Sequence, residues 1–332
     1  MTAHAQPQPQ AKAEAAGSPT RPWWPWFKRA FTIAFFGLVI YLLVSNAREL
    51  EWAQVGEALR KRPLASLLPA ALVAALSYAV YSCYDLLSRR YAGHDLPTPQ
   101  VLCTTFISYA FNLNLGSWVG GLGFRHRLYS RLGLDNGEIS RVIAFSMLTN
   151  WSGYLLLAGT AFLLRPLQIP EDWALGSGAL QVLGGVLVCV AIGYLMLCAF
   201  SRKREWHVRG HEIELPTVRL AGLQLLISSI NWMLIAAVVY LLLQGQVAYP
   251  TVLAVLLIAA VAGVITHVPA GLGVLEAVFV ALLSEQVPKY ELLAALLAYR
   301  AVYYLAPLAV ATALYLFFEA RISQGAVGKE AG

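Results

Sequence analysis

The sequence predicts an all-α polytopic membrane protein with about six full spans and two re-entrant, broken helical hairpins, arranged as a probable inverted repeat. Hydrophobic residues make up 58% of the 332-residue chain and charged residues only 13%, with a mean hydropathy of +0.62. Soluble globular domains carry about 25% charged residues. The apolar residues are also collected in blocks long enough to cross a bilayer, and glycines and a proline interrupt two of these blocks. Together these observations exclude a soluble globular domain.

The amino-terminal part divides into three segments. Residues 1–29 predict a disordered tail and an interfacial anchor, because Trp23, Trp24 and Trp26 lie beside several cations. The short apolar run 31–44 predicts a retained first helix; a cleaved signal peptide is the alternative. Residues 48–62 alternate charged and apolar positions, as in a helix that lies on the membrane surface.

Seven further apolar blocks follow, and two of them are unlike simple spans. The block 101–124 ends in a glycine-rich run with Gly121 and Gly123, and the block 249–283 is broken by Pro269, Gly271 and Gly273. Such breaks are tolerated at membrane depth where protein or water satisfies the freed backbone groups. The remaining blocks are 64–87, 142–164, 178–200, 218–243 and 292–318.

The distribution of positive charge favours re-entrant hairpins at both odd blocks. With two hairpins and six spans, both termini lie inside, and most of the 24 lysines and arginines lie inside with them. This agrees with the excess of cations in cytoplasmic loops. If both blocks crossed fully with the amino terminus inside, more cations would lie outside than inside.

The two halves predict an inverted repeat. A shift of about 150 residues places the glycine break of the first half on that of the second and aligns three spans in each half. We assign residues 30–165 to the first membrane repeat, 175–320 to the second and 321–332 to a cytoplasmic tail. Because three spans is an odd number, the halves have opposite orientation, and the hairpins enter from opposite faces. Chance alignment of similar apolar helices is the alternative.

Two motifs carry a resemblance to a bacterial family. A glycine-rich turn precedes the run Arg-His-Arg-Leu-Tyr-Ser-Arg-Leu-Gly-Leu (125–134) and Glu138, and His-Val-Pro-Ala-Gly-Leu-Gly-Val-Leu-Glu occupies 267–276. Over residues 30–320 the chain resembles the flippase-like transmembrane region of lysylphosphatidylglycerol synthases, in particular its stand-alone YbhN-type inner-membrane relatives. The resemblance implies lipid handling, and it implies no aminoacyl transfer because the catalytic domain of the synthases is missing from this sequence.

Three charged residues interrupt the apolar blocks: Asp85, Glu276 and Arg300. A charge at the bilayer centre costs about 2.5–3.5 kcal/mol on insertion scales, so these side chains are expected to face protein or water. Arg300 is a candidate ligand of a lipid phosphate, and Glu276 a candidate proton carrier or counter-charge to Arg300. Outward snorkelling of Arg300 and a headgroup-level Asp85 near Arg89 are the alternatives.

Polar residues at helical spacing mark a second group of candidates. Asn150 and Asn231 lie in polar stripes of matching blocks, and Tyr303 lies one turn after Arg300. Arg125 and Arg127 follow the first hairpin and are candidates to hold a headgroup phosphate. Hydrogen bonds between packed helices, and an ordinary positive-inside loop, are the alternatives.

The sequence carries no motif of a known enzyme class. We find no P-loop, HExxH or nucleophile elbow, and His126, His267 and the four cysteines lack metal-ligand spacing, so no cofactor, metal or nucleic-acid partner is expected. We expect a phospholipid translocase of the bacterial inner membrane, with a homo-oligomer possible. An ion-coupled solute carrier, a membrane enzyme acting on a lipid phosphate and a purely structural membrane partner are the alternatives.

Overall fold

The computed structural model describes residues 52–164, 177–202, 205–208, 211–266, 268 and 271–330. The predicted tail and anchor at 1–29 and the first helix at 31–44 lie outside these residues. In chain order the elements are α2 (Trp52–Arg60), α3 (Leu64–Ala92), α4 (Thr98–Leu115), η1 (Ser117–Phe124), α5 (Arg125–Arg131), α6 (Asn136–Leu163), α7 (Ser177–Phe200), β1 (Glu205–Val208), β2 (His211–Glu214), α8 (Val218–Leu242), α9 (Tyr249–Thr266), α10 (Val274–Leu283), α11 (Lys289–Tyr299), η3 (Arg300–Leu305) and α12 (Ala306–Glu330).

The predicted helical membrane fold is confirmed. Six helices of the described chain are long and apolar enough to cross a bilayer, with α11, η3 and α12 counted as one and α9 among the six. Their outer faces are apolar: on α3, Leu68, Leu72 and Leu76 are each more than half exposed at a spacing of one turn. Ala70 and Ala74 of the same helix are buried. This inversion of the soluble pattern fits a protein whose surroundings are hydrocarbon.

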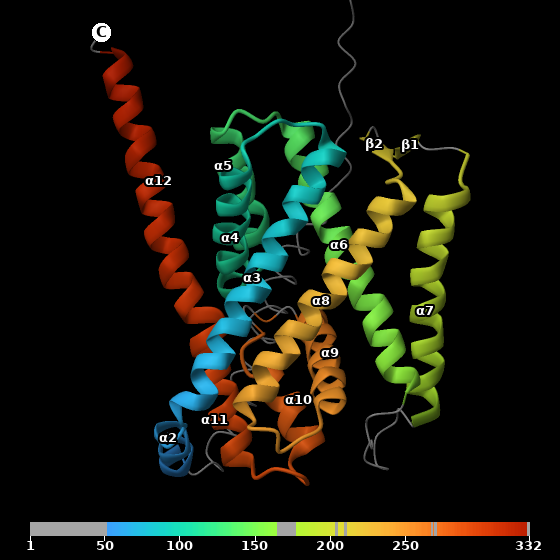
Figure 1. Cartoon of the computed structure of the whole chain (residues 1–332), viewed down its shortest axis with the longest axis vertical. Coiled ribbons are helices and arrows are strands. Elements are labelled where there is room, and N and C mark those ends of the chain that lie inside the picture. Colours follow the sequence, from blue (N-terminus) through green and yellow to red (C-terminus); the bar gives the residue numbers. More distant parts are fainter. Residues whose placement is uncertain are drawn as a thin grey trace, which may run out of the picture. The chain divides into compact units, whose positions relative to one another are not determined.

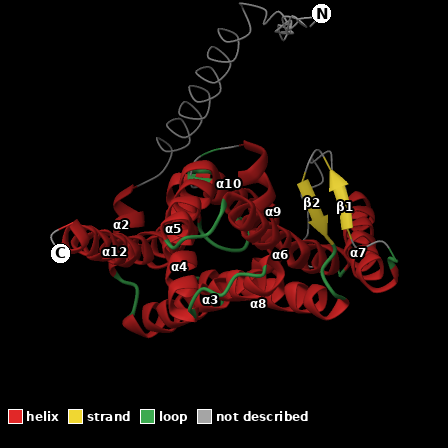
Figure 2. Ribbon diagram, turned by 90° about the horizontal axis from the view of Figure 1, so that it is seen from above, coloured by secondary structure: helices red, strands yellow, loops and turns green. Residues whose placement is uncertain are grey.

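Helices α3 and α8 pack against each other along one face of the described bundle (Figures 1 and 2). The helix α6 packs on both of them, and α7 packs on α6. A Cβ atom on Gly153 of α6 would lie 2.3 Å from the Cβ atom of Ser228 on α8. Glycine therefore permits the close approach of these two helices, as small residues do in membrane bundles.

The first interrupted block folds back on itself. The helix α4 ends at Gly116, whose φ is +85°, and the π-helical η1 returns along α4 to α5 (Figure 1). A Cβ atom on Gly120 would lie 2.2 Å from the carbonyl oxygen of Phe111, so the return path needs glycine there. The rings of Phe111 and Phe124 stack at 4.0 Å between centroids and hold the two arms together.

The second interrupted block also folds back, from α9 into α10. Gly271 and Gly273 have φ of +56° and +78°, and Gly273 caps the start of α10. Figure 1 shows the α9–α10 hairpin and the α4–η1 hairpin toward opposite ends of the bundle. Re-entry into a bilayer and the inverted repeat both stay predictions.

Several elements begin or end at other residues than the segments predicted from the sequence. The helix α6 begins at Asn136, before the apolar run at 142, because Asp135 and Glu138 form a capping box. The segment predicted as a tail from residue 321 continues α12 as helix to Glu330. The loop before α8 forms a two-stranded antiparallel hairpin, β1–β2, that the apolar pattern did not predict.

Candidate functional site

A cavity of about 640 Å³ lies where the two hairpins meet. Its walls come from α3, α4, η1, α5 and α6 and from α8, α9, α10, α11 and η3. Leu115, Met147 and Val264 line it and are each more than 40% exposed, so accessible apolar side chains form part of its wall. Most of the remaining lining is aromatic or aliphatic, with hydroxyls and amides from Ser108, Asn112 and Asn150.

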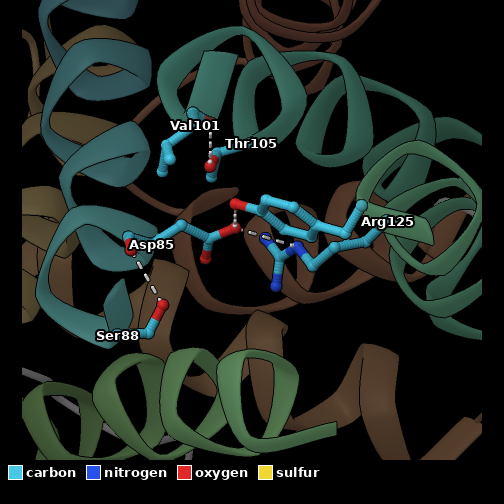
Figure 3. A network of polar contacts seen from close by, with 6 residues as sticks. Asp85, Ser88, Val101, Thr105 and Arg125 are labelled. Carbon is cyan, nitrogen blue, oxygen red and sulfur yellow. Dashed lines mark hydrogen bonds and ion pairs between the residues drawn. The ribbon is translucent and has the colours of Figure 1, made fainter. Parts of the chain in front are cut away.

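Arg125 is the one charged residue in the described lining of this cavity. It is the first residue of α5 and is only 4% exposed. Its Nε lies 3.4 Å from Oδ2 of Asp85, on α3, and does not point along a hydrogen bond to it. Figure 3 shows the two side chains extending toward each other. The cation thus reaches the cavity wall, with its counter-charge behind it.

Asp85 is fully buried, about two turns before the end of α3. Its Oδ2 accepts a hydrogen bond of 2.8 Å from the hydroxyl of Tyr129, whereas its Oδ1 has no partner among the described residues. Arg89 turns away and donates to the backbone oxygen of Leu96 and to Thr98. The tertiary fold therefore buries Asp85 beside Arg125 and not beside Arg89, whereas the alternative that Asp85 lies at headgroup level in the bilayer stays a prediction.

The second ion pair joins Arg300 of η3 to Glu276 of α10. Nε of Arg300 lies 2.5 Å from Oε1, and a terminal nitrogen donates to Oε2 at 3.0 Å. The same guanidinium donates to the backbone oxygen of Gly271 at 3.0 Å and lies over the ring of Tyr304. Arg300 does not snorkel outward. Neither charged residue belongs to the lining of the cavity, which Gly271 and Leu275 provide beside them.

The predicted residues Tyr303 and Asn231 belong to one chain of hydrogen bonds. Ser77 of α3 donates to Oδ1 of Asn231 at 2.8 Å, and its oxygen lies 2.7 Å from the hydroxyl of Tyr303. Because the Ser77 proton goes to Asn231, Tyr303 donates to Ser77, and Tyr109 donates to Tyr303 at 3.1 Å. Tyr303 lines the cavity, whereas Asn231 is buried behind it. The chain joins α4, η3, α3 and α8.

The other predicted residues fall in different places. Asn150 lines the cavity, and its backbone oxygen accepts hydrogen bonds from Ser228 and Trp232. Arg127 is exposed outside the cavity and lies 5.8 Å from the ring centroid of Tyr315 on α12.

Of the glycine and proline breaks, Gly121 and Gly271 line the cavity and Gly123 does not. Pro269 lies outside the described residues. Among the described residues, no group of three or more His, Cys, Asp and Glu side chains is placed to hold a metal ion.

Sequence reasoning missed the pairing of Asp85 with Arg125 and the aromatic lining. Tyr81, Tyr109 and Tyr299 line the cavity together with Tyr303 and Tyr304. The available signal was the helical spacing of Tyr78, Tyr81 and Asp85 on α3, which places all three on one face.

Comparison with known proteins agrees with the resemblance found in the sequence motifs. The family described as the lysylphosphatidylglycerol synthase TM region matches residues 29–311. The chain belongs to this family. It is 46% identical over 306 residues to the inner membrane protein YbhN of Escherichia coli K12, which covers 92% of this chain and 96% of that protein.

More distant relatives extend the comparison. The protein slr0712 of Synechocystis is 30% identical over 240 residues, 71% of this chain and 74% of that protein. The phosphatidylglycerol lysyltransferase of Staphylococcus haemolyticus is 26% identical over 302 residues, 87% of this chain but only 34% of the enzyme. The family and the six apolar helices together identify a multi-pass membrane protein.

Proposed function

We propose that this protein moves a phospholipid between the leaflets of the bacterial inner membrane, with both termini on the cytoplasmic side. The cavity between the hairpins carries the proposal. Its wall contains exposed apolar side chains, and Arg125 adds one cation to it. A lipid requires this combination, because its headgroup phosphate needs a polar partner while its acyl chains remain in hydrocarbon.

The proposal gives the predicted site residues different roles. Arg125 binds the phosphate, and Tyr303 and Asn150 line the path of the headgroup. Glu276, Arg300 and Asn231 support the wall from outside the lining. The size of the cavity falls within the range of about 300–1,000 Å³ that is usual for small-molecule sites, enough for a headgroup whose chains stay outside.

The experiment is lipid movement in proteoliposomes containing the purified protein. Headgroup-labelled phosphatidylglycerol and phosphatidylethanolamine are followed with a membrane-impermeant quencher. We expect Arg125→Gln to slow movement at least tenfold, since about 1.4 kcal/mol of lost phosphate binding already gives that factor. Arg141→Gln is the matched control, because Arg141 is an exposed cation on α6 outside the cavity.

Three results would count against the proposal in different ways. If the folded wild type moves neither lipid, translocation is wrong. Binding of soluble glycerol phosphate as tight as that of the lipid would favour a solute carrier. If Arg125→Gln moves lipid at the wild-type rate, the cavity is not the path. Hydrolysis or modification of the labelled lipid would instead favour the membrane enzyme.

A further inference from the structure

The carboxylates of the two arginine–carboxylate pairs differ in the hydrogen bonds that their oxygens accept. Both oxygens of Glu276 accept hydrogen bonds from Arg300. Asp85 is more deeply buried, yet it accepts one side-chain hydrogen bond, from Tyr129, and its Oδ1 has no described partner. An ionised carboxylate offers about four acceptor positions, and leaving them unfilled in a buried site is costly. The site of Asp85 therefore fits a carboxyl group that is neutral during part of its working cycle.

Arg125 lines the cavity, and the Nε that it turns toward Asp85 makes no hydrogen bond with the described residues. The side-chain oxygens of Ser108 and Asn112, which line the same cavity, also have no hydrogen-bond partner among the described residues. These groups can bind a phosphate together, but the negative charge of Asp85 competes for the same guanidinium. Asp85 itself is not in the lining, so a phosphate at Arg125 does not need to displace it.

Few charged or titratable groups face Asp85. Arg125 and Tyr129 come from α5 and Tyr81 from α3 itself, and His94 acts on Asp85 from the loop after α3. The groups that α4 and α6 bring to this network are hydroxyls, of Thr105 and Ser146, and α8 brings Ser228 and Asn231 to the neighbouring Tyr84. At the start of α6, Glu138 acts on His94 and Arg141 on Tyr91. His94 is thus the one competing group near Asp85 that titrates close to neutral pH.

We propose that Asp85 takes up a proton in each transport cycle and thereby frees Arg125 to hold the lipid phosphate. The proton binds to Oδ1 of Asp85, which is buried and has no hydrogen-bond partner among the described residues. The O–H bond of this carboxyl group is the one covalent bond of the protein that forms or breaks. The site is neutral overall in both states: before, Asp85 balances Arg125; afterwards, the phosphate does. A low-dielectric interior favours such an exchange, because neither state leaves an isolated charge. This inference rests on the proposed translocation and makes it proton-coupled.

The first test measures binding of phosphatidylglycerol, whose phosphodiester does not titrate near neutral pH, to the purified protein between about pH 5 and pH 8. If one proton accompanies each lipid, affinity rises up to tenfold for each unit of falling pH above the midpoint. We expect Asp85→Asn to bind lipid tightly at every pH. Asp95→Asn, an exposed carboxylate ten residues later, and His94→Gln are the controls that should retain the wild-type slope. A wild-type slope in Asp85→Asn would overturn the proposal.

Two further measurements keep the test decisive if Asp85→Asn does not fold. Tyr129→Phe keeps both charges and removes the one hydrogen bond that favours the carboxylate, so the midpoint of the pH profile should move to higher pH. An unmoved midpoint contradicts the proposal. Infrared difference spectra of the wild type with bound phosphatidylglycerol, recorded between acidic and neutral pH, should also contain the carbonyl band of a buried protonated carboxyl.

The infrared result is independent of the proposed function. If no buried carboxyl band appears in the wild type, Asp85 does not bind a proton, and the inference fails even when lipid moves. If the band appears but the wild type moves no lipid at any pH, the translocase proposal fails, and the coupling of the proton to lipid fails with it.

Discussion

The two hairpin regions of this protein both place an arginine beside a carboxylate, but they use the pair differently. In the second hairpin, Arg300 donates to both oxygens of Glu276 and to the backbone of Gly271, outside the lining of the cavity. In the first hairpin region, Arg125 lines the cavity, and its Nε lies 3.4 Å from Asp85 without a hydrogen bond. A fully bonded pair fixes a backbone, whereas an incompletely bonded pair can exchange its partner. The contrast favours a structural role for the Arg300–Glu276 pair and supports the proposal that Arg125 binds a ligand.

The largest effect should come from breaking the fully bonded pair. Removing one partner of a buried ion pair costs roughly 3–5 kcal/mol, because the other charge stays buried without compensation. We expect Glu276→Gln to approach this loss of stability, since it breaks the doubly hydrogen-bonded contact with Arg300, which is not itself in the cavity lining. Asp85→Asn should cost less, because water or lipid in the cavity can solvate Arg125. Thermal unfolding of both variants in one detergent measures the difference.

The reverse order of these two losses of stability would contradict the comparison of the two ion pairs. A larger loss for Asp85→Asn would show that the Asp85–Arg125 pair holds the fold despite its open geometry, and the exchange of partners would lose its structural basis. The double variant Glu276→Gln/Arg300→Gln supplies a control, since it leaves no uncompensated charge and should recover part of the stability lost by Glu276→Gln.

The next largest effects on stability should come from replacing a glycine in each hairpin by alanine. A Cβ atom on Gly120 would overlap the backbone of Phe111, whereas one on Gly271 meets nothing within 4 Å but requires a φ of +56°. We expect Gly120→Ala to destabilise the protein by about 1–3 kcal/mol or more through overpacking. Gly271→Ala should cost about 1–2 kcal/mol through backbone strain. Equal effects, measured by thermal unfolding, would contradict the distinction between close approach and strain.

The smallest expected effect is the contribution of His94, near the first hairpin, to the pH dependence of the protein's stability. Burial lowers the pKa of His94, which lies in the loop after α3 with 7% of its surface exposed. The unfolded chain then binds a proton more readily than the folded protein, so His94 contributes stability above about pH 6.5 that is lost as the pH falls. His94→Gln should flatten the pH dependence of thermal unfolding below that pH. An unchanged profile would exclude His94 as its source.

The sequence by itself determined the membrane class, the positions of the chain breaks and the family. These features are local: the length of an apolar block and a glycine or proline within it do not depend on what packs against them. The match of the spans 64–87 and 218–243 with α3 and α8 follows from this. The chain reversals at Gly116 and near Gly271 follow from the same local features.

Only the tertiary structure decided which charges meet. Asp85 and Arg125 are separated by 40 positions, and the nearer cation Arg89 suggested a local partner that the fold does not use. Pairing with Arg300 was one of two candidate roles for Glu276, beside that of a proton carrier, and the position of both residues outside the cavity lining was not predicted. Pairing between helices depends on register and rotation, and apolar helices carry little sequence information about either. The sequence offered both Arg125 and Arg300 as candidate phosphate ligands, and the packing of the helices places only Arg125 of the two in the cavity lining.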